Sequence, residues 1–148
     1  MTLTTDEFKE LIDKANQDQK PKRKRNSEEA LLQKECLRWF RLQYPTLAPL
    51  LFAVPNGGSR NEKEAAELKR QGVVAVVADL ILLKRSKDRQ YSALCLELKA
   101  KTGKQSLSQI SWEKHAKAHG NRYEVVRTVE EFIRIVNDHL KNELCTSK

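Results

Sequence analysis

Residues 73–83 read VVAVVADLILL, and residues 93–99 read ALCLELK. The first stretch holds ten apolar residues around a single charge, Asp79. Its β-branched content predicts a strand that is buried on both faces. The second stretch alternates, so its leucines lie on one face of a strand and Glu97 and Lys99 on the other. Together the two stretches predict adjacent strands that carry two acids and a lysine.

Helical periodicity, caps and turn residues predict the remaining elements. Helices are expected from Ser27 to about Tyr44, from Asn61 to Gly72, from Ser106 to His119 and over 129–142, and short strands over 51–54 and 123–126. The order helix, strand, helix, strand, strand, helix, strand, helix predicts an α/β fold. In this fold, helices flank a mixed central sheet of about four strands.

The chain has 148 residues and a formal net charge of +8, which fits one domain and favours polyanionic partners such as nucleic acid. We expect a flexible basic N-terminal segment over 1–26, a folded domain over 27–142 and a C-terminal tail over 143–148. The run KPKRKR at 20–25 is either a solvated linker or an arm that follows a phosphate backbone. No window is apolar enough for a membrane span, and the first residues are not a secretory signal. Three widely spaced cysteines indicate neither a disulfide framework nor a zinc knuckle, so we expect an intracellular protein.

Asp79 is a charged residue in an apolar stretch, and burying a carboxylate is costly unless something compensates its charge. It can lie at the exposed end of the strand, pair with a cation or bind a metal. Glu97 and Lys99 project from one face of the neighbouring strand and bring a second acid and a lysine near it. Carboxylates hold Mg²⁺ or Mn²⁺, and such an ion beside a lysine supports phosphodiester hydrolysis. The alternative is a plain Glu97–Lys99 ion pair on an edge strand.

Asp79, 17 intervening residues and then Glu97-Leu98-Lys99 resemble the signature of the PD-(D/E)xK nuclease superfamily. Further matches lie along residues 27–140: Glu29, Gln33, CLRWFR at 36–41, PNGG at 55–58, Gly72 and Gln109. Together they are similar to the virus-type replication-repair nuclease (VRR-NUC) domain in its stand-alone form. Val76 departs from the pattern, because the family has a glycine three residues before the aspartate. The resemblance implies a restriction-endonuclease-like sandwich.

The resemblance also implies an activity, that of a metal-dependent endodeoxyribonuclease that hydrolyses phosphodiester bonds in branched DNA such as four-way (Holliday) junctions. The implied catalytic residues are Glu29, Asp79, Glu97, Lys99 and Gln109. The implied ligands of Mg²⁺ or Mn²⁺ are Asp79, Glu97, the Leu98 carbonyl and Glu29. Stand-alone members resemble junction-cleaving homodimers of DNA repair. This implies a homodimer with no membrane partner in the cytoplasm of a bacterial cell, encoded by the bacterium or by a phage.

Contacts with DNA are expected from two groups of residues near the site. The first group is Asn56, Gly57, Gly58 and Arg60, and the second is Lys101 and Lys104, with Arg122 and Arg127 extending this basic rim.

Alternative interpretations stay open for several of these residues. The residues 56–58 also fit an ordinary turn. Glu29 also fits a helix cap with Asn26, and Gln109 fits a capping box with Ser106 that is compatible with a role in the site. For the whole protein, the alternative function is that of a non-catalytic DNA-binding accessory protein on a nuclease fold.

Overall fold

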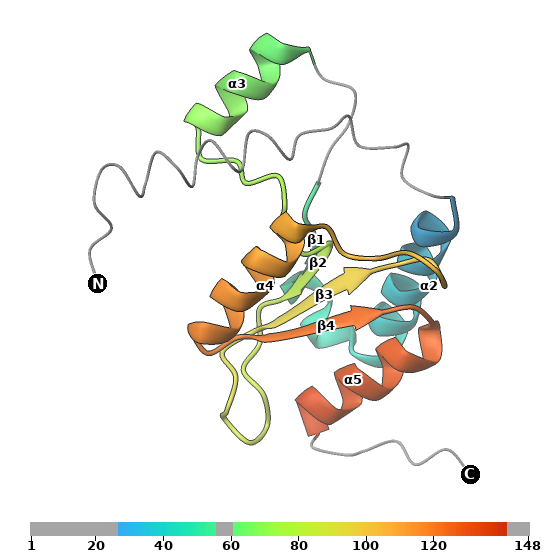
Figure 1. Cartoon of the computed structure of the whole chain (residues 1–148). Coiled ribbons are helices and arrows are strands. Elements are labelled where there is room, and N and C mark those ends of the chain that lie inside the picture. The colour runs from blue at the N-terminus through green and yellow to red at the C-terminus, as the bar shows by residue number, and fades with distance from the viewer. Residues whose placement is uncertain (1–26, 56–60, 142–148) are drawn as a thin grey trace.

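The computed structural model describes residues 27–55 and 61–141. The predictions for the N-terminal segment, for Asn56, Gly57, Gly58 and Arg60, and for the C-terminal tail lie outside this range. Figure 1 shows the elements, which are α2 (Ser27–Gln43), η1 (Pro45–Leu50), β1 (Leu51–Ala53), α3 (Glu62–Arg70), β2 (Leu80–Leu82), β3 (Leu94–Leu98), α4 (Leu107–Ala118), β4 (Arg122–Val126) and α5 (Val129–Lys141). Apart from the short 3₁₀ helix η1, the order is the predicted one. Within the described ranges, no helix has the length and apolar character of a membrane span.

The four strands of the described residues form one mixed sheet in the order β1-β2-β3-β4. The pairs β1–β2 and β2–β3 are antiparallel, whereas β3–β4 is parallel. A parallel neighbour requires a crossover connection, and α4 supplies it between β3 and β4. The predicted mixed sheet of about four strands is therefore confirmed.

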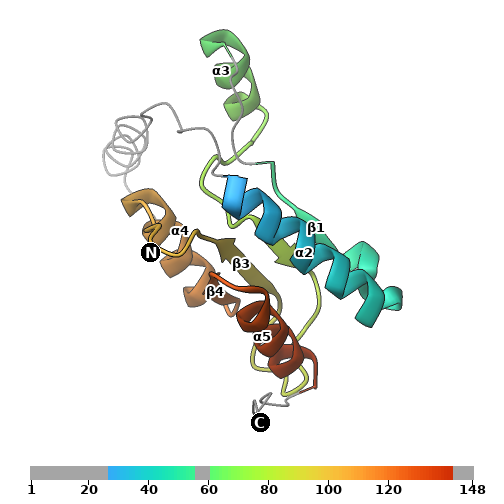
Figure 2. The same ribbon diagram turned by 90° about the vertical axis from the view of Figure 1, so that its right-hand side faces the viewer.

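Helices cover both faces of this sheet. The leucines at 94, 96 and 98 pack with buried residues of α2 and α5, such as Phe40 and Phe132, in the main core. On the other face, Cys95 and Tyr123 pack against Trp112 of α4. Figure 2 shows α2 and α5 together on one side of the sheet and α4 on the other. The alternation predicted for the strand over 93–99 is thus confirmed.

The strand predicted over 73–83 is wrong for its first seven residues. β2 begins only at Leu80, and the chain makes a turn at Ala75 and Val76. Val73 and Val74 are 45% and 49% exposed. A strand needs at least one neighbouring strand to pair with, and here both neighbours of β2 end: β1 stops at Ala53 and β3 at Leu98. Pairing overrides β-branched propensity when no partner backbone is available.

Helix α3 begins and ends where the sequence predicts. The Asn61 side chain accepts a hydrogen bond from the Glu64 N–H at 2.8 Å. Gly72 follows the helix with φ +91°, a conformation that glycine adopts without steric cost. None of the residues of α3 is buried, and Figure 1 shows the helix standing clear of the sandwich.

Candidate active site

Asp79 and Glu97 lie opposite each other on adjacent strands. β2 and β3 pair antiparallel with Leu80 opposite Leu96, so the residue before Leu80 falls opposite the residue after Leu96. Directly opposed residues of antiparallel strands point to one face, with Cβ atoms about 4.5–5.5 Å apart. The two acids of the predicted motif therefore share one face of the sheet.

Hydrogen bonds hold Asp79 in this position. Its carbonyl accepts a hydrogen bond from the Val54 N–H at 2.9 Å, which continues the β1–β2 pairing by one residue. Its carboxylate oxygen Oδ2 accepts another from the Leu98 N–H at 2.9 Å. The carboxylate thus reaches the strand that carries Glu97 and contacts the backbone of the very next residue.

Glu97 is buried, with an exposure of 1%. Its Oε1 accepts a hydrogen bond from Gln109 Nε2 at 2.6 Å and forms an ion pair with Lys99 Nζ at 3.1 Å. Its Oε2 accepts one from the Tyr123 hydroxyl at 3.4 Å. Burial, and after it the nearby charge of Asp79, raise the pKa of Glu97 to about 7, and Lys99 opposes this only in part. The site therefore places two carboxylates close enough to repel each other.

Gln109 joins a helix cap to this site. It is the third residue of α4, and its Oε1 accepts a hydrogen bond from the Ser106 N–H at 2.8 Å. Its own N–H donates to Ser106 Oγ at 3.2 Å. Because the cap engages the amide oxygen, the amide nitrogen is the atom that donates to Glu97. The predicted capping box and the predicted position at the site are both present in this one side chain.

Lys99 stands on the same face as Glu97, two residues further along the chain. The backbone N–H of Lys99 donates to the Val126 carbonyl at 3.0 Å, and this hydrogen bond extends the β3–β4 pairing beyond Leu98. Its side chain is 12% exposed, against 2% for the side chain of Glu97. Lys99 therefore pairs with the buried carboxylate and is itself the more exposed of the two side chains.

Glu29 reaches the site from α2 but does not join the two acids directly. Its Oε1 accepts a hydrogen bond from the Ala100 N–H at 3.1 Å. Within 27–55 and 61–141, no three acidic, histidine or cysteine side chains lie close enough to hold one metal ion. The paired carboxylates are thus those of Asp79 and Glu97, and Glu29 holds the turn beside them.

Arg127 holds the same turn, which follows β3. Its Nη1 donates to the carbonyls of Ala100 and Gly103, each at 2.7 Å. The turn carries Lys101 and Lys104, which are exposed. The guanidinium predicted to extend the basic rim is therefore directed at the backbone, and the two lysines are the cations that the turn presents to solvent.

Tyr123 is a residue of the site that the sequence alone did not reveal. In the parallel β3–β4 pair, Tyr123 lies opposite Cys95. Cys95 precedes Glu97 by two residues and shares its face of the sheet, so the side chain of Tyr123 emerges on that face too. Burial and the charge of Glu97 raise the pKa of its hydroxyl, which therefore stays protonated at neutral pH. Its only sequence signal was the alternation of β4, and that says nothing about which strand lies beside it.

These groups fit Mg²⁺ or Mn²⁺. Mg²⁺ in enzymes is usually held by one or two carboxylates, and waters and substrate phosphates complete its shell. The structure offers two carboxylates, with the Leu98 backbone hydrogen-bonded to one of them. Burial raises the pKa of Glu97, and the nearby charge of Asp79 raises it further; a bound cation would relieve the repulsion between the two carboxylates.

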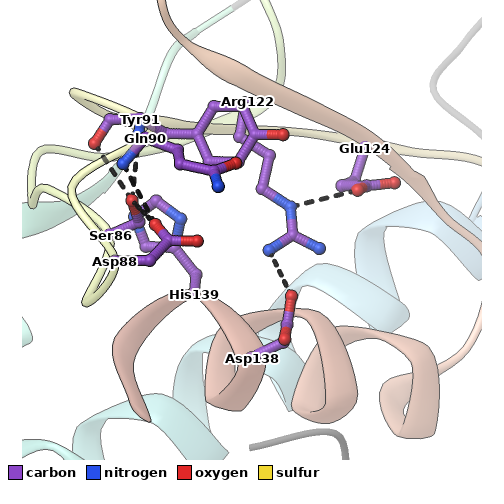
Figure 3. Close-up of a pocket in the computed structure, with 8 residues that line it drawn as sticks. All are labelled: Ser86, Asp88, Gln90, Tyr91, Arg122, Glu124, Asp138 and His139. Carbon is purple, nitrogen blue, oxygen red and sulfur yellow. Dashed lines mark hydrogen bonds and ion pairs between the residues drawn. The ribbon is translucent and has the colours of Figure 1, made fainter. Parts of the chain in front are cut away.

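A polar pocket of about 290 Å³ lies away from this site, at the opposite end of β3 and β4, and is lined by Ser86, Asp88, Gln90, Tyr91, Arg122, Glu124, Asp138 and His139 (Figure 3). Arg122 pairs there with Glu124 at 3.1 Å and with Asp138 at 2.7 Å. It lies opposite Leu94, three residues before Glu97. The prediction that Arg122 belongs to the basic rim of the site is therefore wrong, because two acids engage its guanidinium at the far end of the strand.

Comparison with known proteins supports the fold. No family model and no curated protein matches the sequence. Among solved structures, the chain is similar to one described as a VRR_NUC domain protein, with a TM-score of 0.65 and 22% sequence identity. The likeness covers 79% of this chain and 91% of that chain. The predicted resemblance is thus confirmed at the level of the fold: the chain has the α/β fold of a VRR-NUC domain, which is a nuclease-type fold.

Proposed function

We propose that this protein is a Mg²⁺- or Mn²⁺-dependent endodeoxyribonuclease of the VRR-NUC family. The observation that carries the proposal is that Asp79 and Glu97 lie opposite each other on one face of the sheet, with Lys99 beside them. Two carboxylates and a partly exposed lysine are the groups needed to hold a divalent cation against a phosphate. The VRR-NUC fold of the chain supports the same assignment.

Each residue of the site has a role in this proposal. Asp79 and Glu97 would bind the cation, with the Leu98 carbonyl as a further ligand. When bound, the ion would activate the attacking water and offset the negative charge of the phosphate. Lys99 and Gln109 both contact Glu97 Oε1 and restrict the rotation of the carboxylate. The Lys99 ammonium would also donate to a phosphate oxygen and stabilise the charge that develops during cleavage.

We further propose branched DNA, such as four-way junctions, as the substrate and a homodimer as the active form. The net charge of +8 favours a nucleic acid, and Lys101 and Lys104 would contact phosphates next to the scissile bond. Two symmetric cuts in a four-way junction need two active sites related by a two-fold axis. Such an enzyme would serve DNA repair or phage replication in a bacterial cell.

Cleavage of defined DNA structures tests the proposal. Purified protein is incubated with labelled four-way junction, flap and linear duplex DNA in Mg²⁺, Mn²⁺ or EDTA. We expect cuts in the branched substrates with either metal and none in EDTA. Light scattering of the same preparation is expected to give the mass of a dimer.

Variants of the site identify the residues responsible. Asp79→Asn keeps an oxygen to accept the Leu98 N–H but removes the charge, and it should abolish cleavage while DNA binding persists. Lys99→Ala should do the same. Asp88→Asn, at the far pocket, is the matched control and should cut like the wild type.

Two outcomes would contradict the proposal. Wild-type cleavage by a clean Asp79→Asn preparation would remove this site from the chemistry. DNA binding that is unaffected by EDTA, with no cut product in any metal, would instead support a non-catalytic DNA-binding accessory protein.

A further inference from the structure

We propose that Tyr123 is a positioning residue of the metal site, because its hydroxyl holds the second oxygen of Glu97. This inference rests on the proposed function, since it assigns a role to Tyr123 in metal binding by Glu97. It concerns a contact between β3 and β4 that the nuclease motif does not include.

The strand pairing places the tyrosine within reach. Tyr123 lies opposite Cys95 in the parallel pair, so its ring runs along the sheet face toward Glu97, whose Oε2 lies 3.4 Å from the hydroxyl. The distance is long for a hydrogen bond between oxygens, which is typically about 2.7–2.8 Å. Hydrogen bonds of catalytic sites are often long before the ligand binds and then shorten.

The direction of this hydrogen bond follows from its neighbour. Gln105 Nε2 lies 3.3 Å from the same hydroxyl oxygen, and an amide NH₂ group can only donate. The hydroxyl oxygen therefore accepts from Gln105, and its single proton is left for Glu97, which accepts. The tyrosine thus donates to the carboxylate.

A chain of side chains supports Gln105 and the ring. The Gln105 amide also donates to Glu113 Oε2 at 2.9 Å, and Glu113 Oε1 pairs with Lys117 Nζ at 2.6 Å. The ring of Trp112 lies 5.9 Å from that of Tyr123, centroid to centroid. Two residues of α4 therefore support Tyr123: Trp112 packs against its ring, and Glu113 holds the Gln105 amide that donates to its hydroxyl.

The consequence concerns the orientation of the Glu97 carboxylate. Gln109 and Lys99 both contact Oε1, and the tyrosine hydroxyl contacts Oε2. The tyrosine is therefore the contact that restrains the second oxygen against rotation of the carboxylate. Partners that orient a metal ligand commonly contribute about 10–100-fold to metal affinity or activity. Loss of the hydroxyl should therefore weaken metal binding while the fold is retained.

The test uses Tyr123→Phe, which removes only the hydroxyl and keeps the ring against Trp112. Mn²⁺ binding to the full-length protein is measured by calorimetry without DNA, and the Mn²⁺ concentration for half-maximal cleavage is measured separately. We expect about tenfold weaker binding, and a matching rise in the half-maximal concentration. At saturating Mn²⁺ we expect kcat to stay within about threefold of the wild type, because the ligands themselves are unchanged.

Two further variants serve as a control and as an independent test of the same contact. Tyr44→Phe removes another tyrosine hydroxyl, which donates to Asn137 Oδ1 at 2.6 Å on the α2–α5 side of the sheet, and it should bind Mn²⁺ like the wild type. Gln105→Met keeps the side-chain length but cannot donate, and it should weaken Mn²⁺ binding less than Tyr123→Phe does, because Gln105 acts only through the tyrosine hydroxyl.

The outcomes separate this inference from the proposed function. If the wild type binds Mn²⁺ and cuts DNA but Tyr123→Phe binds Mn²⁺ equally well, the positioning role is overturned and the nuclease proposal stands. Equal losses in Tyr123→Phe and Tyr44→Phe would also overturn it, because the effect would then be one of general stability. A wild type that neither binds Mn²⁺ nor cuts would contradict the proposed function itself.

Discussion

Replacing Glu97 by glutamine should stabilise the metal-free protein, and should do so more at alkaline than at acidic pH. Burial and the charge of Asp79 raise the pKa of Glu97 from the ordinary value of 4.5 to about 7. Each pKa unit corresponds to about 1.4 kcal/mol. Ionised Glu97 therefore lowers the free energy of unfolding by about 3 kcal/mol once the pH exceeds both values.

The folded protein holds the proton of the Glu97 carboxyl more tightly than the unfolded chain does. Because the folded state has the higher pKa, protonated Glu97 favours folding below pH 4.5, and this contribution is lost as the pH rises through about 7. Glutamine does not titrate, and its Oε1 can still accept from Gln109 and Lys99. The gain from the substitution should thus grow from about 1 kcal/mol at pH 5 to about 3 kcal/mol at pH 8.

Urea denaturation in EDTA at pH 5 and pH 8 measures this difference. Glu130→Gln, an exposed glutamate in the first turn of α5, is the control and should change stability by no more than about 0.5 kcal/mol at either pH. An equal gain for Glu97→Gln at both pH values, or a loss at pH 8, would refute the reasoning. Saturating Mn²⁺ should reduce the difference in stability at pH 8. A ligand of the native state stabilises the protein that binds it more tightly, and that protein is the wild type.

Three further predictions concern the supports of the site and the far pocket. Arg127→Leu removes the hydrogen bonds to the Ala100 and Gly103 carbonyls. It should lower the free energy of unfolding by about 1–3 kcal/mol and weaken binding of junction DNA in EDTA. Unchanged values in denaturation and binding assays would contradict the role of Arg127 in holding this turn. Ser106→Ala removes the helix cap of α4 and should lower the free energy of unfolding by about 1 kcal/mol. It should also slow cleavage, because the same cap orients Gln109. Ser111→Ala, on the exposed side of α4, is the control for both measurements. Burial lowers the pKa of His139 below its ordinary 6.5, so its neutral form favours folding and stability should be lost as the pH falls from 6.5 through the lowered pKa. Urea denaturation at pH 7.5 and 5.5 in the Glu97→Gln background checks this without the opposite trend of Glu97, and the loss should be absent when His139 is also replaced by glutamine.

Local patterns predicted much of this fold. The alternation in residues 93–99 placed Glu97 and Lys99 on one face, and the structure confirms it. The caps at Asn61 and Ser106 involve residues only three positions apart. Such features depend on side chains that are close in sequence, so their physical cause is visible in the sequence itself.

Features that depend on pairing between distant segments were not visible in this way. The valines at 73 and 74 have the propensity of a strand, but within residues 27–55 and 61–141 no neighbouring strand extends far enough to pair with them. Tyr123 reaches Glu97 only because β3 and β4 are parallel in one particular register. Arg127 was predicted to belong to the phosphate-binding rim from its charge and its place beside the site, whereas the structure directs it to backbone carbonyls of a turn 24–27 residues earlier.

The early end of β2 also explains how one aspartate can sit in an apolar stretch and still serve a metal. Asp79 is the residue directly before β2, and its exposure is 9%, against 0% for Leu80. Had the strand continued to Val73, a partner strand on each side would have enclosed the carboxylate, and its charge would have been costly to bury. A strand that begins after Asp79 keeps the pairing that sets this residue opposite Glu97, and the segment before it turns instead of continuing the sheet. The position at the strand end and the proposed binding of a metal, which were alternatives when only the sequence was considered, are therefore compatible.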